Sequence, residues 1–334
     1  MKRQAYSLLA GAVSAMVLAA IPGSPALAAA AKAKVAIVIR DTSNPYWRAL
    51  RDGAIDEGKK LGVDVTVQAG ANETDIVGEN AKISTMANQD YTCFGVVPIN
   101  GTNVITPLLP VSQKGIPIIN LDTALDAKAV KSAGLKLTSF IGSDNVRAGK
   151  IAGEHMLSLT GGKGDVALLL GIPGEQNGIN RETAFRAVTK GKLHVVQTQV
   201  ADYERAKGLS ATTTMLKVHP HIVGIFSAND EMGLGAAQAI SNAGKSGKIK
   251  VISVDGEKEA IQSVKAGKLS ATVSQYPYAE GQMAVQACQA IAQGKKIPTK
   301  IESPIKLITP ANADQALAKF PQPFFSFDDP FGAP

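Results

Sequence analysis

The sequence predicts an α/β protein made of two consecutive doubly wound, Rossmann-like units. From Lys34 onward, short β-branched runs alternate with longer segments of helical period, which is typical of parallel strands joined by helices. This alternation runs through the first half of the chain and starts again near residue 145. A chain of 334 residues also exceeds what one hydrophobic core usually supports, so two units are expected.

The predicted elements follow from the apolar runs and the helical segments between them. The first half is predicted to contain strands over 34–39, 63–68, 94–97, 116–120 and 138–142, with helices over 45–61, 75–89, 101–114 and 126–132. The second half is predicted to contain strands over 165–170, 193–200, 222–227, 249–254 and 270–275, with helices over 145–160, 178–190, 204–217, 230–243 and 257–266. A helix over 278–293 and a strand over 304–308 complete the prediction.

The first 28 residues have the pattern of a secretory signal peptide. Two basic residues precede an uncharged run from Ser7 to Ile21, and the cleavage pattern Ala26-Leu27-Ala28 follows. We therefore expect export and cleavage after Ala28. An uncleaved membrane anchor is the alternative, although the run is short for a membrane span.

Composition and charge describe an ordinary globular protein, with 45% hydrophobic and 19% charged residues. The formal net charge is +7, and removal of the two basic residues of the signal leaves a mildly basic chain. The charges are spread through the sequence without a basic block, so a nucleic-acid partner is not expected.

The two cysteines are both expected to be buried. Cys93 begins an apolar strand and Cys288 lies on an apolar helix face. We predict two buried thiols, and a disulfide is the alternative that an exported chain permits.

The C-terminal segment 320–334 has an unusual composition, because it holds five of the nine Phe residues together with four Pro residues. The aromatic content is too high for a solvated tail, while the prolines exclude a regular element. The segment is predicted to lie extended over the body of the protein, with no role assigned to it.

Polar side chains gather where the predicted strands end. In open α/β sheets ligands bind beyond the carboxyl ends of the strands, so these positions are candidate ligand contacts. The loop after the first strand places Tyr46 and the single Trp, Trp47, next to Asn44, although two aromatics packing a helix start are an alternative. Other strand ends contribute Asp122, Arg181, Tyr203, Asn229, Asp255 and Gln275.

These residue types suit a polyhydroxylated ligand. A carboxylate accepts from two vicinal hydroxyls, amides both donate and accept, and aromatic faces cover the C–H surface of a sugar ring. By contrast, Asp144, Asp230 and Glu231 are interpreted as caps of the helices that follow them.

Six motifs, taken together and in order, resemble the periplasmic sugar-binding proteins of the ribose-binding type, which deliver ligand to ABC transporters. The motifs are S-N-P-Y-W at 43–47, G-S-D-N-x-x-A-G at 142–149, A-D-Y-E-R at 201–205, A-N-D-E-M at 228–232, V-D-G at 254–256 and S-Q-Y-P at 274–277. The similarity runs from about Lys34 to Pro310. It implies that the ligand-binding positions are Asn44, Tyr46, Trp47, Asp122, Arg181, Tyr203, Asn229, Asp255 and Gln275.

The resemblance also implies two lobes joined by a three-segment hinge, with the ligand cleft between them. The chain would cross near 143, 275 and 304, so that one lobe holds 31–142 and 276–304 and the other holds 143–275 and 305–315, followed by a tail over 316–334. The implied function is capture of a monosaccharide or sugar alcohol in the periplasm and delivery to a membrane permease. A chemoreceptor is compatible as a further partner, and no cofactor or metal is expected.

The chain departs from the family pattern at several positions. Thr123 stands where the ribose binder has an arginine, and a short hydroxyl cannot make the same bidentate contact. An amide position of the family falls near Pro98, with Asn100 as a nearby replacement, while Glu175 and Asn177 add polarity to the second lobe. We include Thr123 and Asn177 in the predicted site, and ribose is only one of several candidate ligands.

Two other classes of protein are disfavoured. An enzyme would be expected to show a nucleophile elbow or a phosphate loop, and neither motif occurs; the pair His219 and His221 lacks the further ligands of a zinc site. A regulator of the lac-repressor type would need an N-terminal helix-turn-helix where this chain has its signal-like segment. The protein is therefore predicted to be a binding protein and not an enzyme.

Overall fold

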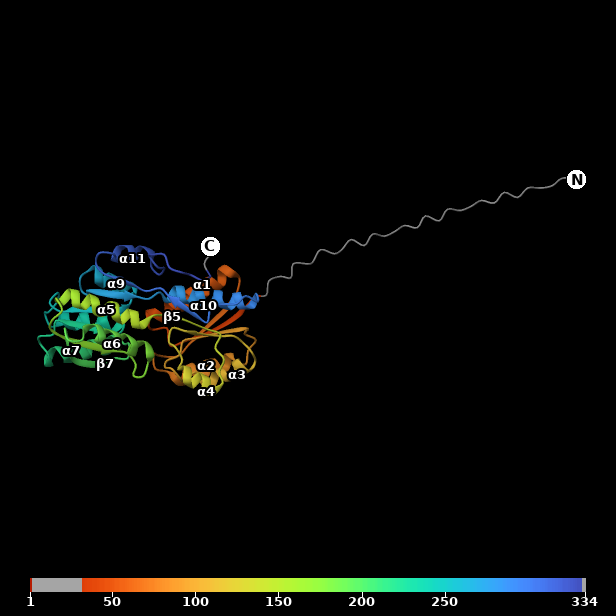
Figure 1. Cartoon of the computed structure of the whole chain (residues 1–334), viewed down its shortest axis with the longest axis horizontal. Coiled ribbons are helices and arrows are strands. Elements are labelled where there is room, and N and C mark those ends of the chain that lie inside the picture. The colour runs from red at the N-terminus through yellow and green to blue at the C-terminus, as the bar shows by residue number, and fades with distance from the viewer. Residues whose placement is uncertain (2–31, 332–334) are drawn as a thin grey trace. The chain divides into compact units, whose positions relative to one another are not determined.

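The computed structural model describes Met1 and residues 32–331. The predicted signal peptide, apart from Met1, lies outside the described residues. Within the described part, the chain forms two six-stranded sheets and eleven helices (Figure 1). No helix in this part combines the length and the apolar character that a bilayer span requires.

The first sheet has the strand order β11-β5-β4-β3-β1-β2, and every pair in it is parallel. Its strands are β1 (Lys34–Ile39), β2 (Asp64–Ala69), β3 (Cys93–Val96), β4 (Ile118–Leu121), β5 (Ser139–Ser143) and β11 (Lys300–Ser303). We call this sheet the first lobe, together with the helices α1 (Pro45–Leu61), α2 (Ile76–Met86), α3 (Ile105–Gln113), α4 (Ala127–Ala133) and α10 (Pro277–Ala292).

The second sheet has the strand order β12-β10-β9-β8-β6-β7, and only the pair of β10 with β12 is antiparallel among these described strands. Its strands are β6 (Asp165–Leu170), β7 (His194–Val200), β8 (Gly224–Ser227), β9 (Lys250–Asp255), β10 (Ala271–Ser274) and β12 (Lys306–Ile308). The second lobe adds the helices α5 (Asn145–Thr160), α6 (Gln176–Thr189), α7 (Arg205–Val218), α8 (Asp230–Asn242), α9 (Lys258–Lys265) and α11 (Ala313–Lys319).

The C-terminal part of the prediction needs correction. The strand expected over 304–308 is the shorter β12 of the second sheet, and β11, which lies just before it and joins the first sheet, was not predicted. Pro304 lies between them, and a proline cannot donate to a strand ladder, so the ladder is interrupted there. Helix α11 was not predicted either; its apolar side chains Ala313, Ala316 and Leu317 are few, and they pack against a core cluster of the second lobe.

The central strand of the first sheet shows why the apolar runs become strands. Residues 35–39 of β1 are fully buried, because helices cover both faces of a parallel sheet. Helix α1 then begins at Pro45, where Asn44 caps the first turn, and ends at Gly62, whose φ of 63° suits a glycine.

Helices α1 and α10 lie side by side on the first lobe (Figure 1). Their close approach depends on glycine. A Cβ atom at Gly53 of α1 would lie 2.0 Å from the carbonyl oxygen of Tyr278 in α10. The chain therefore returns to the first lobe after completing most of the second.

A disulfide fixes this return. Cys93 at the start of β3 and Cys288 on α10 are bonded, with their Cα atoms 5.8 Å apart. The prediction of two buried thiols is therefore wrong, although both side chains are buried as expected. The local sequence patterns located each cysteine on its element but did not indicate that α10 covers β3.

The C-terminal segment lies over both lobes without forming a helix or strand between 320 and 331. Phe324 packs against a core cluster of the second lobe, whereas Phe327 and Phe331 pack against a core cluster of the first. The Nε2 atom of Gln322 donates to Oε1 of Gln282 on α10 at 3.2 Å. The C-terminal segment therefore packs on the body of the protein through its aromatic residues, as the sequence predicted.

Candidate functional site

A polar cavity lies where strand ends of the two sheets face each other. It has an empty volume of about 300 Å³, and its lining comes from both lobes and from the segment between β10 and α10. The lining residues are Arg40, Asn44, Tyr46, Trp47, Glu73, Asp122, Glu175, Asn177, Arg181, Tyr203, Asn229, Asp255 and Gln275.

The structure brings the predicted site residues together. All eleven predicted residues except Thr123 line the cavity. Thr123 lies directly behind the wall, where its hydroxyl donates to Oδ2 of Asp122 at 2.9 Å. The strand-end rule therefore located side chains that are far apart in sequence but adjacent in space.

The first-lobe wall contains the two predicted aromatic residues. The rings of Tyr46 and Trp47 meet edge to face with their centroids 4.7 Å apart, and each side chain is only 4% exposed. The Tyr46 hydroxyl donates to Oδ1 of Asp122 at 2.8 Å, and the guanidinium of Arg40 lies 5.0 Å from the Trp47 ring. Asp122 has a φ of 53°, a conformation that non-glycine residues adopt mainly at constrained sites.

The second-lobe wall contains Arg181, which α6 presents in a fixed orientation. Its Nε donates to Oδ1 of Asn145 at 2.7 Å and its Nη1 donates to the carbonyl oxygen of Ala228 at 2.7 Å. Helix α5 packs closely behind it, because a Cβ atom at Gly149 would lie 2.2 Å from the Arg181 carbonyl oxygen. The guanidinium is therefore positioned before any ligand arrives.

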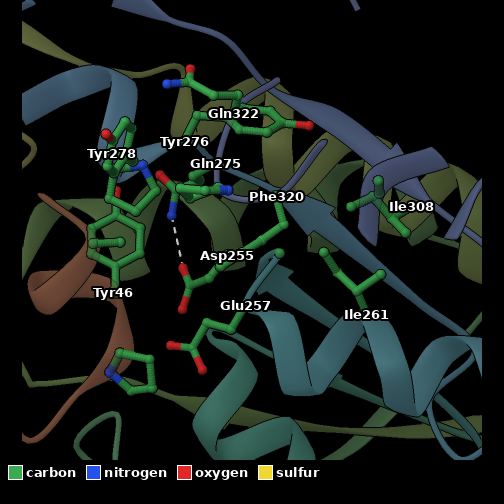
Figure 2. A pocket seen from close by; sticks show the side chains of 16 residues that line it. Tyr46, Asp255, Glu257, Ile261, Gln275, Tyr276, Tyr278, Ile308, Phe320 and Gln322 are labelled. Carbon is green, nitrogen blue, oxygen red and sulfur yellow. Dashed lines mark hydrogen bonds between the residues drawn. The ribbon is translucent and has the colours of Figure 1, made fainter. Parts of the chain in front are cut away.

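Asp255 lies at the end of β9 and next to the crossing between the lobes. Its Oδ1 accepts from Nε2 of Gln275 at 2.8 Å and lies 4.0 Å from Nη1 of Arg181. Figure 2 shows this bond beside Tyr46, in a neighbouring cavity that shares these residues. Burial raises the pKa of Asp255 well above its usual value, Arg181 opposes the shift, and the charge of Asp230 adds to it.

Asp230 does not cap α8, and that interpretation is wrong. The cap is Asn229, whose side chain accepts from the backbone N–H of Met232 at 3.0 Å. Asp230 instead accepts from the Thr272 hydroxyl at 2.7 Å and from the backbone N–H of Glu257 at 2.8 Å. It thereby connects β10 with the start of α9 behind Asp255, and burial raises its pKa to about 6.

Asn177 and Glu175 of the second lobe form several interactions with the first lobe across the cavity. Nδ2 of Asn177 donates to Oδ2 of Asp122 at 2.9 Å, and Nη2 of Arg40 lies 3.4 Å from Oε1 of Glu175. Glu175 also caps α6 and accepts from the Tyr203 hydroxyl at 2.5 Å. Burial opposes ionisation of Glu175, but Arg40 and these hydrogen bonds outweigh it and lower its pKa.

The prediction missed three residues of the cavity, namely Arg40, Glu73 and Glu175, although it noted the polarity of Glu175. Arg40 directly follows β1 and Glu73 follows β2, so the strand-end rule applied to every strand would have found both. Nη2 of Arg40 also donates to the Thr123 hydroxyl at 2.6 Å, so a guanidinium reaches Thr123 from another strand. Asn100 does not replace an amide of the site, because its side chain accepts from backbone N–H groups of its own turn.

Two buried oxygens in the cavity lack a hydrogen bond to any described residue. They are Oε2 of Glu73 and Oε1 of Gln275. Both are acceptors, and an unpaired buried acceptor is unfavourable unless a donor reaches it. The cavity is therefore prepared for a ligand that donates hydrogen bonds.

The comparisons with known proteins agree with this geometry. Residues 35–296 match the periplasmic binding protein domain. The D-allose-binding periplasmic protein of Escherichia coli is 34% identical over 83% of this chain and 91% of its own length. The ribose import binding protein RbsB of the same organism is also 34% identical, over 90% of this chain and 97% of its own length.

A solved structure gives the same result for the fold. An ABC transporter periplasmic solute-binding protein from Actinobacillus succinogenes with bound D-allose superimposes with a TM-score of 0.79. It is 32% identical and covers 85% of this chain and 99% of its own. On these matches, the chain belongs to the periplasmic binding protein family.

Proposed function

We propose that this protein captures a monosaccharide or sugar alcohol in the cavity between its lobes and delivers it to the permease of an ABC transporter. The observation that carries the proposal is the cavity itself, in which amides, carboxylates, two guanidinium groups and three aromatic rings converge from both lobes. These are the groups that bind the hydroxyls and the C–H face of a sugar.

A neutral ligand fits the charges of the cavity best. Arg40 is paired with Glu175, and Arg181 lies beside Asp255, so neither guanidinium group is left without a carboxylate and an anionic ligand is not required. The free Oε1 of Gln275 is an acceptor that a hydroxyl can satisfy. D-allose and D-ribose, the sugars in the names of the relatives, are therefore the first candidates.

We further propose how the lobes move. The lobes would consist of 31–142 with 276–304 and of 143–275 with 305–315, joined by three segments near 143, 275 and 304, with the tail over 316–334. Rotation about these segments would open the cavity, and a ligand that bonds to both walls would favour the closed arrangement. The closed surface would then dock on the permease, and a chemoreceptor would be able to read the same surface.

We propose that the protein is a carrier and not an enzyme, and that it is exported with cleavage after Ala28. The relatives are named as binding proteins, and the family is periplasmic. N-terminal sequencing of the exported chain checks the cleavage site.

A thermal-shift screen tests the proposed function. The panel contains D-allose, D-ribose, other pentoses and hexoses, and sugar alcohols. A ligand present at 100 times its dissociation constant adds about 2.7 kcal/mol to the free energy of unfolding, which is readily detected. A shift with at least one sugar supports the proposal, and no shift with any member of the panel contradicts it.

A further inference from the structure

Glu73 is a buried carboxylate of the cavity that the strand-end analysis did not include. It lies in the loop between β2 and α2, is 5% exposed, and lines the cavity beside Arg40, Asn44 and Trp47. Its position on the wall formed by Trp47 makes it a candidate for direct ligand contact.

One oxygen of Glu73 is held firmly by the wall. Oε1 accepts from Nδ2 of Asn44 at 2.6 Å and from Nε1 of Trp47 at 2.8 Å. The other end of the Asn44 amide accepts from the backbone N–H of Tyr46 at 2.9 Å, where it caps α1. Asn44 is thus occupied with orienting Glu73 and starting the helix.

The other oxygen is free to accept. Oε2 of Glu73 makes no hydrogen bond within residues 32–331, and the nearest cationic atom, Nη1 of Arg40, is 3.8 Å away. That separation gives an ion pair but is too long for a hydrogen bond. A donor from the ligand would complete the hydrogen bonding of this carboxylate.

On the basis of the proposed function, we infer that Glu73 is a specificity-determining residue whose Oε2 accepts one hydroxyl of the bound sugar. The protein would then prefer a sugar with a hydroxyl at the end that lies against Trp47, and it would discriminate against the analogue that is deoxy at that position. Loss of a hydroxyl that a buried polar group requires is a strong basis for discrimination.

The charges around Glu73 indicate a neutral hydroxyl. An ammonium group at this position would be repelled by Arg40, whose Nη1 lies 3.8 Å from Oε2 of Glu73. An anionic group would be repelled by the carboxylate itself. A hydroxyl carries neither penalty, and it forms a charge-assisted hydrogen bond with the carboxylate.

The protonation of Glu73 provides an independent readout. Burial raises its pKa to about 7, Arg40 opposes the shift, Asp41 adds to it, and the hydrogen bonds from Asn44 and Trp47 oppose it. A donated hydroxyl favours the ionised form, so ligand binding lowers this pKa. Affinity is therefore expected to rise with pH through about 7, because more of the free protein then carries the carboxylate.

The experiment compares Glu73→Gln with a matched control, Glu79→Gln, by calorimetry. Glu79 is a buried carboxylate of α2 in the same lobe whose pKa burial also raises to about 7, but it does not line the cavity. The probes are D-allose, D-ribose and the monodeoxy derivatives of whichever binds more tightly.

We expect Glu73→Gln to weaken binding of the parent sugar about tenfold, because a charged acceptor is replaced by a neutral amide. One deoxy derivative should bind the native chain weakly, and Glu73→Gln should reduce its affinity little further. Glu79→Gln should keep the native affinity within about twofold. Between pH 6 and pH 8 the affinity of the native chain should rise, and the affinity of Glu73→Gln should rise less.

Several results would overturn the inference. The inference would be overturned if Glu73→Gln bound every sugar with native affinity. It would also be overturned if the substitution reduced the affinity for all deoxy derivatives equally, which would indicate a purely structural role. An affinity of the native chain that is flat from pH 6 to pH 8 would contradict it without any variant. If the native chain bound no sugar at all, the proposed function would fail together with the inference, whereas sugar binding that the substitution leaves intact would overturn the inference alone.

Discussion

Asp255 illustrates how much a single residue of the site depends on its neighbours. Its backbone φ of 134° is a conformation that L-residues rarely adopt, and the side chain is 5% exposed. Gln275 and Arg181 hold it between the two lobes. Such strain persists where the surrounding structure enforces it, as at ligand sites.

The substitution Asp255→Asn tests this residue. Asparagine keeps the shape of the side chain and tolerates unusual backbone angles, so the substitution removes the charge and replaces one accepting oxygen by an NH2 donor. Because a hydrogen bond to a charged group contributes about 1.5–3 kcal/mol, sugar affinity should fall roughly 10- to 100-fold in calorimetry.

The free energy of unfolding at pH 7 should not fall in this variant. Asp255 and Asp230 are two buried carboxylates that repel each other, and the substitution removes one of them. The exposed substitution Asp165→Asn at the start of β6 serves as the control. Native sugar affinity in Asp255→Asn would exclude this carboxylate from the site.

The sequence located individual residues of the cavity where each follows its strand directly. Asp122 and Asp255 come at the ends of β4 and β9, so an apolar run followed by a carboxylate was sufficient to locate them. It could not predict that Asn44 donates to Glu73, because that contact joins two loops and no periodic pattern records it. Arg40 directly follows β1, so the strand-end rule would have located it, but its contacts with Pro98 and Glu175 join residues that are distant in sequence and could not be predicted.

Most helices and strands were predicted from local periodicity, whereas their distribution between the two lobes was expected only through the family resemblance. Helix α10 follows the second sheet in sequence but packs on the first, and its Cys288 is bonded to Cys93. Likewise, β11 and β12 are separated by only two residues yet belong to different sheets. Pairing of this kind depends on contacts between distant segments, which a hydrophobic pattern does not specify.

The disulfide between β3 and α10 should make a large contribution to stability. It closes a loop between residues 195 apart, and loops of this length restrict the unfolded chain strongly. The double variant Cys93→Ala and Cys288→Ala should lose about 2–5 kcal/mol in the free energy of unfolding, measured by denaturant titration.

Alanine is the appropriate replacement, because serine would introduce unpaired hydroxyls at two buried positions. A reductant should lower the stability of the native chain toward that of the double variant and leave the double variant unchanged. Equal unfolding midpoints for the oxidised native chain and the double variant would contradict a stabilising role.

In the whole molecule, the chain crosses from one lobe to the other three times: after β5, after β10 and after β11. Contacts such as Asn177 with Asp122 then join the two walls of the cavity. The two-lobe arrangement was predicted through the family resemblance, since composition and periodicity alone indicate only two α/β units. Under the proposed closure, the relative angle of the lobes would depend on contacts across the cavity and on the ligand, which no sequence pattern encodes.

Small-angle X-ray scattering with and without a saturating sugar tests the central claim most directly. The ligand is the sugar that gives the largest thermal shift, at a concentration that saturates the native chain, and Asp255→Asn, which is predicted to bind more weakly, serves as the control. If the protein captures sugar by closing its lobes, the radius of gyration of the native chain should fall when the sugar is added, and that of the control should fall less at the same concentration. An unchanged radius of gyration for the native chain at full saturation would contradict capture by lobe closure.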